Sequence, residues 1–274
     1  MQDWQKIKDK KRIVIKVGTS TLTYPTGKLN FQRIEKLSMV LSDLRNRGKE
    51  VLLVSSGAIG VGAGRLGLNE KPTEISKKQA LAAIGQAELI KIYQKFFDNY
   101  NQIVAQVLLT KDGIAHTKRK LNAKNTLFTL LHMGIIPIIN ENDTVAIDEI
   151  VFGDNDTLSA DVSVLIEAGL LILLSDIDGL FDEDPRKNPK ANLLTKVEEI
   201  NEEIEYLAKG EGSSFSTGGM VTKISAAKTC AKANIDTVIT NGADPSIIFD
   251  ILEGKEKGTL FVSGKIKEKL AGKK

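Results

Sequence analysis

The chain has 274 residues, 42% of them hydrophobic, which is enough to fill a substantial core. Its 38 Lys and Arg and 35 Asp and Glu leave a formal net charge of +3, and its single cysteine, Cys230, excludes an intrachain disulfide and favours a reducing compartment. One Cys and two His at unrelated spacings cannot assemble a metal site, so we expect none. No apolar run reaches the roughly 20 residues of a membrane span. We therefore expect a cytoplasmic protein without membrane contact.

The first elements predicted along the chain form a βαβ unit. Residues 12–17 are a β-branched run that ends at Gly18, as a buried strand ends at a phosphate-binding loop. Asn30 is placed to cap a helix whose apolar residues recur at helical spacing up to Gly48. Residues 51–55 are a second buried strand, and the crossover between parallel strands should be right-handed.

The same alternation continues through the middle of the chain. Small side chains after the second strand indicate a tightly packed helix start, and we expect the next helix to turn Leu81 and Ile84 inward. Pro137 is unusual for a strand because proline cannot donate to the ladder, yet the isoleucines around it favour one. The expected elements are helix 57–64, helix 76–99, strand 103–109, helix 117–133 and strand 135–139.

The later part of the chain repeats the pattern around one long loop. A hairpin should lie over the site, and a segment rich in Asp, Pro, Lys and Asn should be loop. The expected elements are hairpin 144–152, helix 156–168, strand 170–174, loop 178–192, a Glu-rich helix, a helix ending near 233, strand 237–240, helix 245–252 and strand 259–261.

Alternating strands and helices predict an α/β fold, a three-layer αβα sandwich with a central, mostly parallel sheet. We expect one domain over residues 1–262, with a substrate lobe over about 1–168 and a nucleotide lobe over about 169–262 that share one sheet. The lysine-rich residues 263–274 should form a solvated basic tail, so no nucleic-acid partner is expected. Functional loops should gather at the carboxyl ends of the strands.

Glycine-rich motifs at those strand ends indicate a phosphate site. Lys16 stands two residues before Gly18, and a buried lysine would be costly unless it faced the mouth of a site, although it could equally be an edge-strand charge. Gly57 follows the second strand, where successive N–H groups can form an anion nest or the glycine can simply serve packing. Gly219 opens a helix that carries Lys223 one turn in, which offers backbone donors and a cation to a nucleotide.

Two polar motifs have a functional and a local explanation. Ser175 and Asp176, at the end of the strongest strand, can hold an adenine, a ribose or magnesium, or can be turn residues. Residues 154–156, Asp-Asn-Asp, can be a turn and helix cap, but three such residues exceed what a cap needs. Neither the P-loop nor the dinucleotide-binding glycine motif is present.

Taken in order, these motifs resemble those of glutamate 5-kinases, members of the amino-acid-kinase family. The strings that carry the resemblance are Lys-Val-Gly-Thr-Ser at 16–20, Ser-Ser-Gly-Ala-Ile at 55–59, Asn-Glu-Asn-Asp at 140–143, Phe-Gly-Asp-Asn-Asp at 152–156, Gly-Leu-Phe at 179–181 with Asp-Pro-Arg at 184–186, and Thr-Gly-Gly-Met at 217–220 with Thr222 and Lys223. Each string is short, whereas the ordered set from about residue 12 to 261 is highly specific.

The resemblance implies phosphorylation of the side-chain carboxylate of L-glutamate, with ATP and Mg²⁺, to an acyl phosphate. It implies that Lys16 and Lys223 stabilise the transferring phosphoryl group and that Asp156 holds both lysines. The implied glutamate-binding residues are Ser56, Gly57, Asp143, Asp154 and Asn155. The implied ATP-binding residues are Lys16, Gly18, Ser175, Asp176, Thr217, Gly218, Gly219, Met220, Val221, Thr222 and Lys223.

The chemistry agrees with this assignment. A carboxylate acceptor is already ionised at neutral pH, so positioning and charge neutralisation suffice and no catalytic histidine is needed. Among the substrate groups, we expect Asp143 to take the α-ammonium, and Asn155 with nearby N–H groups to bind the carboxylates. His116 and His132 should be structural or surface residues.

The resemblance also bears on partners and alternatives. Many family members continue into a small C-terminal module, whereas this chain ends soon after Phe261, so we expect a short form. The family implies L-proline as a feedback inhibitor, a homo-oligomer (dimer or tetramer) and a downstream glutamyl phosphate reductase. Two alternatives stay open: a related kinase for aspartate, N-acetylglutamate or carbamate, and a nucleotide-binding regulator without catalysis.

Overall fold

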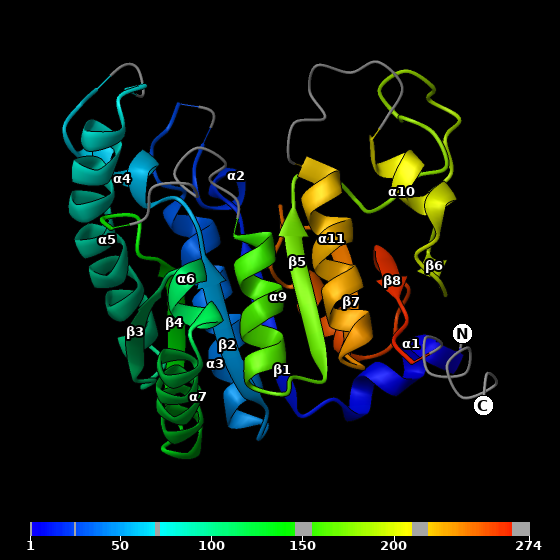
Figure 1. The fold of residues 1–274 in the computed structure, drawn as a ribbon, viewed down its shortest axis with the longest axis horizontal. Coiled ribbons are helices and arrows are strands. Elements are labelled where there is room, and N and C mark those ends of the chain that lie inside the picture. Colours follow the sequence, from blue (N-terminus) through cyan, green and yellow to red (C-terminus); the bar gives the residue numbers. More distant parts are fainter. Residues whose placement is uncertain (1, 25, 69–71, 146–154, 210–218, 265–274) are drawn as a thin grey trace.

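The computed structural model describes residues 2–24, 26–68, 72–145, 155–209 and 219–264. Within these ranges an eight-stranded sheet has the order β3-β4-β2-β1-β5-β7-β8-β6 (Figure 1). All neighbouring strands are parallel except β7 and β8. The strands are β1 Arg12–Val17, β2 Glu50–Ser55, β3 Val104–Leu109, β4 Ile136–Glu141, β5 Leu170–Ser175, β6 Lys196–Val197, β7 Asp236–Asn241 and β8 Thr259–Phe261.

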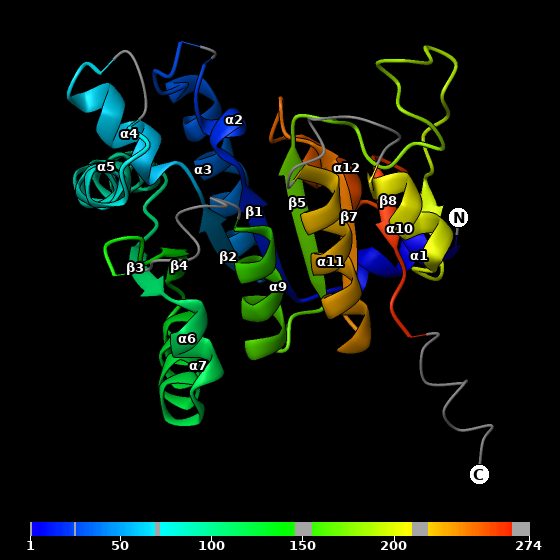
Figure 2. The ribbon, with the colours of Figure 1, turned by 45° about the horizontal axis from the view of Figure 1, so that its top comes forward.

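Helices cover both faces of this sheet, so the predicted three-layer sandwich is confirmed (Figure 2). Buried side chains of α3, α5 and α12 form one core, and those of α7, α9 and α11 form the other. The helices are α1 Gln2–Lys6, the 3₁₀ turn η1 Ile7–Asp9, α2 Thr19–Leu22, α3 Phe31–Asn46, α4 Ala58–Arg65, α5 Ile75–Asp98, α6 Lys111–Ala115, α7 Thr117–His132, α9 Asp156–Leu165, α10 Glu202–Lys209, α11 Gly219–Lys232 and α12 Ile247–Leu252. No helix of the described residues is long and apolar enough to cross a bilayer.

Local sequence signals account for most of these boundaries. The Asn30 side chain accepts a hydrogen bond from Arg33 N at 3.1 Å and so caps α3, as predicted. Pro137 lies opposite Ala105 of β3, and pairing with β2 begins only at Ile138. The ladder with β2 thus begins just after the residue that cannot donate, and the predicted strand is confirmed.

Two glycines let α4 and α5 touch backbone to backbone. A Cβ built on Gly62 would lie 2.0 Å from Leu81 O, and one on Gly85 would lie 1.7 Å from Ala58 O. The expectation that Ile84 faces inward is wrong, since this side chain is 38% exposed. The helix turns Gly85 toward α4 instead, because only a residue without a side chain permits that approach.

The carboxyl ends of the central parallel strands meet at one edge, where the sequence motifs lie. Strands from residues 12–141 form one half of the sheet and strands from residues 170–261 the other half. The assignment of these halves to a substrate and a nucleotide lobe stays a prediction. The hairpin expected over 144–152 lies outside the described residues from 146 onward, as does the tail from 265.

Candidate active site

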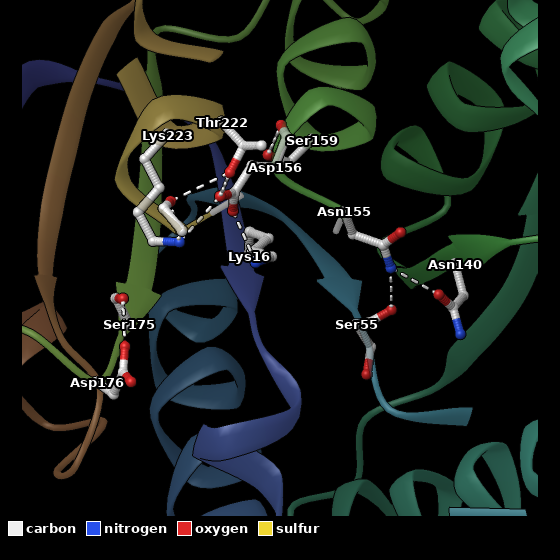
Figure 3. A network of polar contacts seen from close by, with 11 residues as sticks. Lys16, Ser55, Asn140, Asn155, Asp156, Ser159, Ser175, Asp176, Thr222 and Lys223 are labelled. Atoms are coloured by element: carbon white, nitrogen blue, oxygen red, sulfur yellow. Dashed lines mark hydrogen bonds and ion pairs between the residues drawn. The ribbon is translucent and has the colours of Figure 1, made fainter. Parts of the chain in front are cut away.

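Two buried lysines meet one buried carboxylate at this edge (Figure 3). Lys16 Nζ lies 2.7 Å from Asp156 Oδ1, and Lys223 Nζ lies 3.0 Å from Asp156 Oδ2. The three residues are 4%, 0% and 7% exposed, respectively. The structure thus brings together the three residues expected to be catalytic, from β1, α9 and α11.

Strand alternation places Lys16 on the face that α9 and α11 cover. Its neighbours Ile15 and Val17 belong to the core on the opposite face, whereas Val14, two residues away, shares the α9 and α11 side. The ion pair at 2.7 Å replaces the hydration that this ammonium loses on burial. The reading of Lys16 as an edge-strand charge is wrong, because β1 lies between β2 and β5.

The electrostatics of the cluster keep Asp156 ionised. Burial acts to raise the pKa of this carboxyl, but the charges of Lys16 and Lys223 outweigh burial and lower it from 3.8 to about 2. Two ammonium groups and one carboxylate give these three side chains a combined charge of +1, which favours an anion beside them. A buried ion pair contributes little net stability, so its chemistry is the better reason for its presence.

Thr222 is a further contact of the Asp156 carboxylate. Its Oγ1 lies 3.0 Å from Asp156 Oδ2 and 3.1 Å from Gly219 O, and Lys223 Nζ also donates to Gly219 O at 3.1 Å. The sequence placed Thr222 in the ATP-binding segment but did not reveal this link to Asp156. The first turn of α11 therefore holds the carboxylate and also aims its backbone N–H groups out of the helix N-terminus.

The Asn155 amide lies on the β2 side of the lysine cluster. Its Nδ2 donates to Ser55 O at 2.8 Å and to Asn140 Oδ1 at 2.7 Å. Ser56 is buried, and its Oγ has no hydrogen-bond partner among the described residues. Gly57 has a φ of +99°, a left-handed conformation that favours glycine. The backbone turn that leads into α4 therefore calls for a glycine here, in addition to any need for a small side chain in packing.

Helix α5 contributes two polar contacts that the sequence did not reveal. Asn140 Nδ2 donates to Gln86 Oε1 at 2.6 Å, and Tyr93 OH lies 3.0 Å from Ser55 Oγ. Burial raises the pKa of the Tyr93 hydroxyl, which therefore stays protonated. Gln86 and Tyr93 are seven residues apart and so lie on one helix face, a polar spacing that could have indicated the pair.

Strand order explains where the other predicted residues lie. Because β1 lies between β2 and β5, the lysine cluster lies between the Asn155 amide and the Ser175–Asp176 pair, as Figure 3 shows. Ser175 Oγ donates to Asp176 Oδ1 at 3.1 Å. Asp143 is half-buried in the turn after β4. Three predicted site residues lie outside the described residues: Asp154, Thr217 and Gly218.

The side chains of the site suit the phosphates of a nucleotide that brings its own metal ion. The described residues contain no group of three His, Cys, Asp or Glu side chains arranged to hold an ion. Mg²⁺ usually binds through phosphates, waters and one or two carboxylates, so it needs no such group. Two buried lysines beside a helix N-terminus fit the phosphates themselves.

The mostly parallel sheet and the lysine cluster define an α/β phosphotransferase. The family model of the amino acid kinase family matches residues 11–241, and the chain belongs to this family. It is 57% identical to a glutamate 5-kinase of Clostridium perfringens over 263 residues, which cover 94% of this chain and 98% of the relative. It is 55% identical to a glutamate 5-kinase of Listeria innocua, covering 95% of this chain and 96% of that one. The structure of a UMP kinase from Ureaplasma parvum is similar in fold, with a TM-score of 0.65 and 17% identity over 93% of this chain and 99% of that one.

Proposed function

We propose that this chain transfers the γ-phosphoryl group of ATP to the γ-carboxylate of L-glutamate, giving L-glutamyl 5-phosphate in the first step of proline biosynthesis. The observation that carries the proposal is the approach of Lys16 and Lys223 to opposite oxygens of Asp156, beside the Asn155 amide. The high identity to glutamate 5-kinases over nearly the whole chain supports the choice of acceptor.

The reaction asks little of acid–base chemistry. A γ-carboxylate oxygen attacks the γ-phosphorus, a new O–P bond forms, and the bond to the departing ADP oxygen breaks. Because the acceptor is already ionised, the chain must align the two substrates and neutralise the moving charge. Lys16 and Lys223 supply that neutralisation, and Asp156 keeps both ammonium groups in place. Bound with the nucleotide, Mg²⁺ supplies further positive charge to the phosphate oxygens.

The remaining site residues divide between the two substrates. We assign the amino acid to Ser56, Gly57, Asp143, Asp154 and Asn155. We assign ATP to Gly18, Ser175, Asp176 and the segment 217–223. The buried Ser56 Oγ, which has no hydrogen-bond partner within the described part of the chain, supports its assignment, since such a hydroxyl is suited to a ligand.

The test is an assay that traps the labile acyl phosphate with hydroxylamine. We expect hydroxamate formation that requires L-glutamate, ATP and Mg²⁺, with no comparable rate on L-aspartate or N-acetyl-L-glutamate. Acetylation removes the charged ammonium that the acceptor site should hold. Equal turnover of the acetylated substrate would overturn the proposal in favour of a related amino-acid kinase.

The chemistry of the product bears on the partners we propose. An acyl phosphate hydrolyses readily, so a downstream glutamyl phosphate reductase should consume it promptly. We also propose a cytoplasmic homo-oligomer, dimer or tetramer, with L-proline as feedback inhibitor. Light scattering of the purified chain, with and without L-proline, measures the assembly directly.

A further inference from the structure

Three side-chain amides form a chain from helix α5 to the acceptor side of the site. Gln86 Oε1 accepts from Asn140 Nδ2 at 2.6 Å, and Asn140 Oδ1 accepts from Asn155 Nδ2 at 2.7 Å. Asn140 and Asn155 are both buried, and Gln86 is half-buried. This row of hydrogen-bonded amides runs from α5 through Asn140 of β4 and ends at Asn155, the residue before Asp156.

A backbone N–H fixes the direction of every amide in this chain. Glu141 N lies 2.9 Å from the Asn140 side chain, and because an N–H can only donate, Asn140 must turn its oxygen there. The Asn140 nitrogen then faces Gln86, which must present an oxygen. On the other side Asn155 must present its nitrogen to the Asn140 oxygen.

The second proton of Asn155 Nδ2 is committed as well. It is donated to Ser55 O at 2.8 Å, and a carbonyl oxygen can only accept. Both donors of the amide are therefore used, and its Oδ1 points away from the two acceptors (Figure 3). What this amide has left to offer a ligand is an acceptor, so the expected donation from Asn155 to a substrate carboxylate does not fit.

The position of Gln86 is itself well determined. Its neighbour Gly85 packs against the backbone of α4, where a Cβ would lie 1.7 Å from Ala58 O. About two turns further along the same face of α5, Tyr93 OH lies 3.0 Å from Ser55 Oγ, so α5 also holds the strand end whose carbonyl binds Asn155. Helix α5 thus supports the Asn155 amide at both of its donor contacts.

We propose that Gln86 is a positioning residue that acts through Asn140 and holds Asn155 in place as the hydrogen-bond acceptor for the α-ammonium group of the amino-acid substrate. The inference rests on the proposed function, because it concerns how that substrate is recognised. Asn155 and Asp143 then share the ammonium, and the carboxylates are left to backbone N–H groups and Ser56.

Two substitutions at residue 86 test whether the hydrogen bond from Asn140 to this side chain holds Asn155 in place. Gln86→Met keeps the length of the side chain and removes the acceptor of Asn140 Nδ2, so Asn140 keeps its contact with Glu141 N but loses its anchor on α5 and positions Asn155 less firmly. Gln86→Glu keeps an oxygen toward Asn140. The probes are L-glutamate, by KM and kcat, and glutarate, which lacks the ammonium, by its Ki as a competitor of L-glutamate. Lys91→Met, on an exposed position of α5, is the matched control.

We expect Gln86→Met to raise the KM for L-glutamate about tenfold, as for loss of a hydrogen bond to a charged group, with little change in kcat or in the glutarate Ki. Gln86→Glu and Lys91→Met should stay near wild type. The inference would be overturned if Gln86→Met raised the glutarate Ki as much as the KM for L-glutamate, or if it left that KM unchanged. It would also be overturned if Gln86→Glu raised the KM for L-glutamate as Gln86→Met does. These outcomes presuppose wild-type turnover of L-glutamate, whose absence would instead overturn the proposed function.

Discussion

Lys223 Nζ lies 3.0 Å from Asp156 Oδ2, within a site where the aspartate is fully buried. The relationship joins the first turns of two helices, α9 and α11, that come from segments 67 residues apart. Lys16 holds the other oxygen of the same carboxylate at 2.7 Å. One side chain therefore holds two cations in place, and the proposed phosphoryl transfer would use both of them.

The first prediction concerns these cations. Lys223→Ala or Lys16→Ala should lower kcat by about a hundredfold or more, since each removes a charge that counts most while charge is moving. The effect on the KM for L-glutamate should be smaller. Steady-state kinetics with the hydroxamate assay measure both quantities.

Lys228→Ala is the matched control for that experiment. Lys228 is on the same helix, pairs with Glu205 at the surface, and is 45% exposed at its side chain. Its loss should leave kcat unchanged. If Lys228→Ala and Lys223→Ala reduced kcat equally, the helix would matter for reasons other than the charge at Asp156.

The second prediction is a pH dependence of stability. The pKa of Asp156 is about 2 in the folded chain against 3.8 ordinarily, because the two lysine charges outweigh its burial. A lowered pKa adds stability that is complete above the ordinary value and is lost as the pH falls through the folded value. The contribution of this carboxylate should therefore be constant from neutral pH to about pH 4 and decline below it.

Urea unfolding at several pH values compares wild type with Asp156→Asn. The free energy of unfolding of wild type should fall more steeply than that of the variant below about pH 4, where only wild type binds this extra proton on unfolding. Identical slopes would mean that Asp156 titrates normally in the folded chain. Between pH 6 and pH 8 the difference between the two proteins should not vary.

The third prediction concerns the contact between α4 and α5. Gly85→Ala should destabilise the fold by about 1–3 kcal/mol, the usual cost of overpacking, because the new Cβ overlaps Ala58 O. It should also raise the KM for L-glutamate, because a shift of Ala58 would move its neighbour Gly57, which we assign to the amino-acid substrate. Thermal unfolding and steady-state kinetics measure the two effects.

Gly64→Ala offers the comparison. Gly64 is an exposed residue of α4, and a Cβ there would lie 3.6 Å from Gly27 O, an ordinary contact. Alanine in a helix interior is favoured over glycine by about 0.5–1 kcal/mol, so this variant should be as stable as wild type or more so. Equal destabilisation by both substitutions would contradict the close approach of the two helices.

Much of this fold could be predicted because its signals are local. Most of the predicted strands are short apolar runs that end at glycine or at polar residues, and the Asn30 cap needs only three residues of context. The inward face of α5 could not be assigned in the same way. Ile84 follows the apolar pattern, yet the face that packs is decided by Gly85 and a backbone on another helix.

The candidate site likewise contains residues that the sequence identified and residues that it did not. The resemblance identified Lys16, Asp156 and Lys223, and the structure brings these three together. The spacing of Gln86 and Tyr93 places both on one helix face, but the role of Gln86 depends on Asn140, 54 residues away in the sequence, and a half-buried glutamine on a helix is ordinary. The direction of a side-chain amide is likewise decided by partners from several strands, which a single sequence does not reveal.

The last prediction concerns feedback inhibition. Proline keeps the α-carboxylate and a cationic nitrogen of glutamate but lacks its γ-carboxylate. It can therefore occupy the amino-acid end of the acceptor site, with its nitrogen beside Asp143, and leave the phosphoryl site empty. Inhibition should be competitive with L-glutamate, and Asp143→Ala should raise the KM for L-glutamate and the Ki for L-proline by similar factors. Kinetics at several concentrations of both amino acids measure the two constants. If Asp143→Ala shifted the KM alone, or if saturating L-glutamate did not relieve inhibition, proline would bind at a separate site.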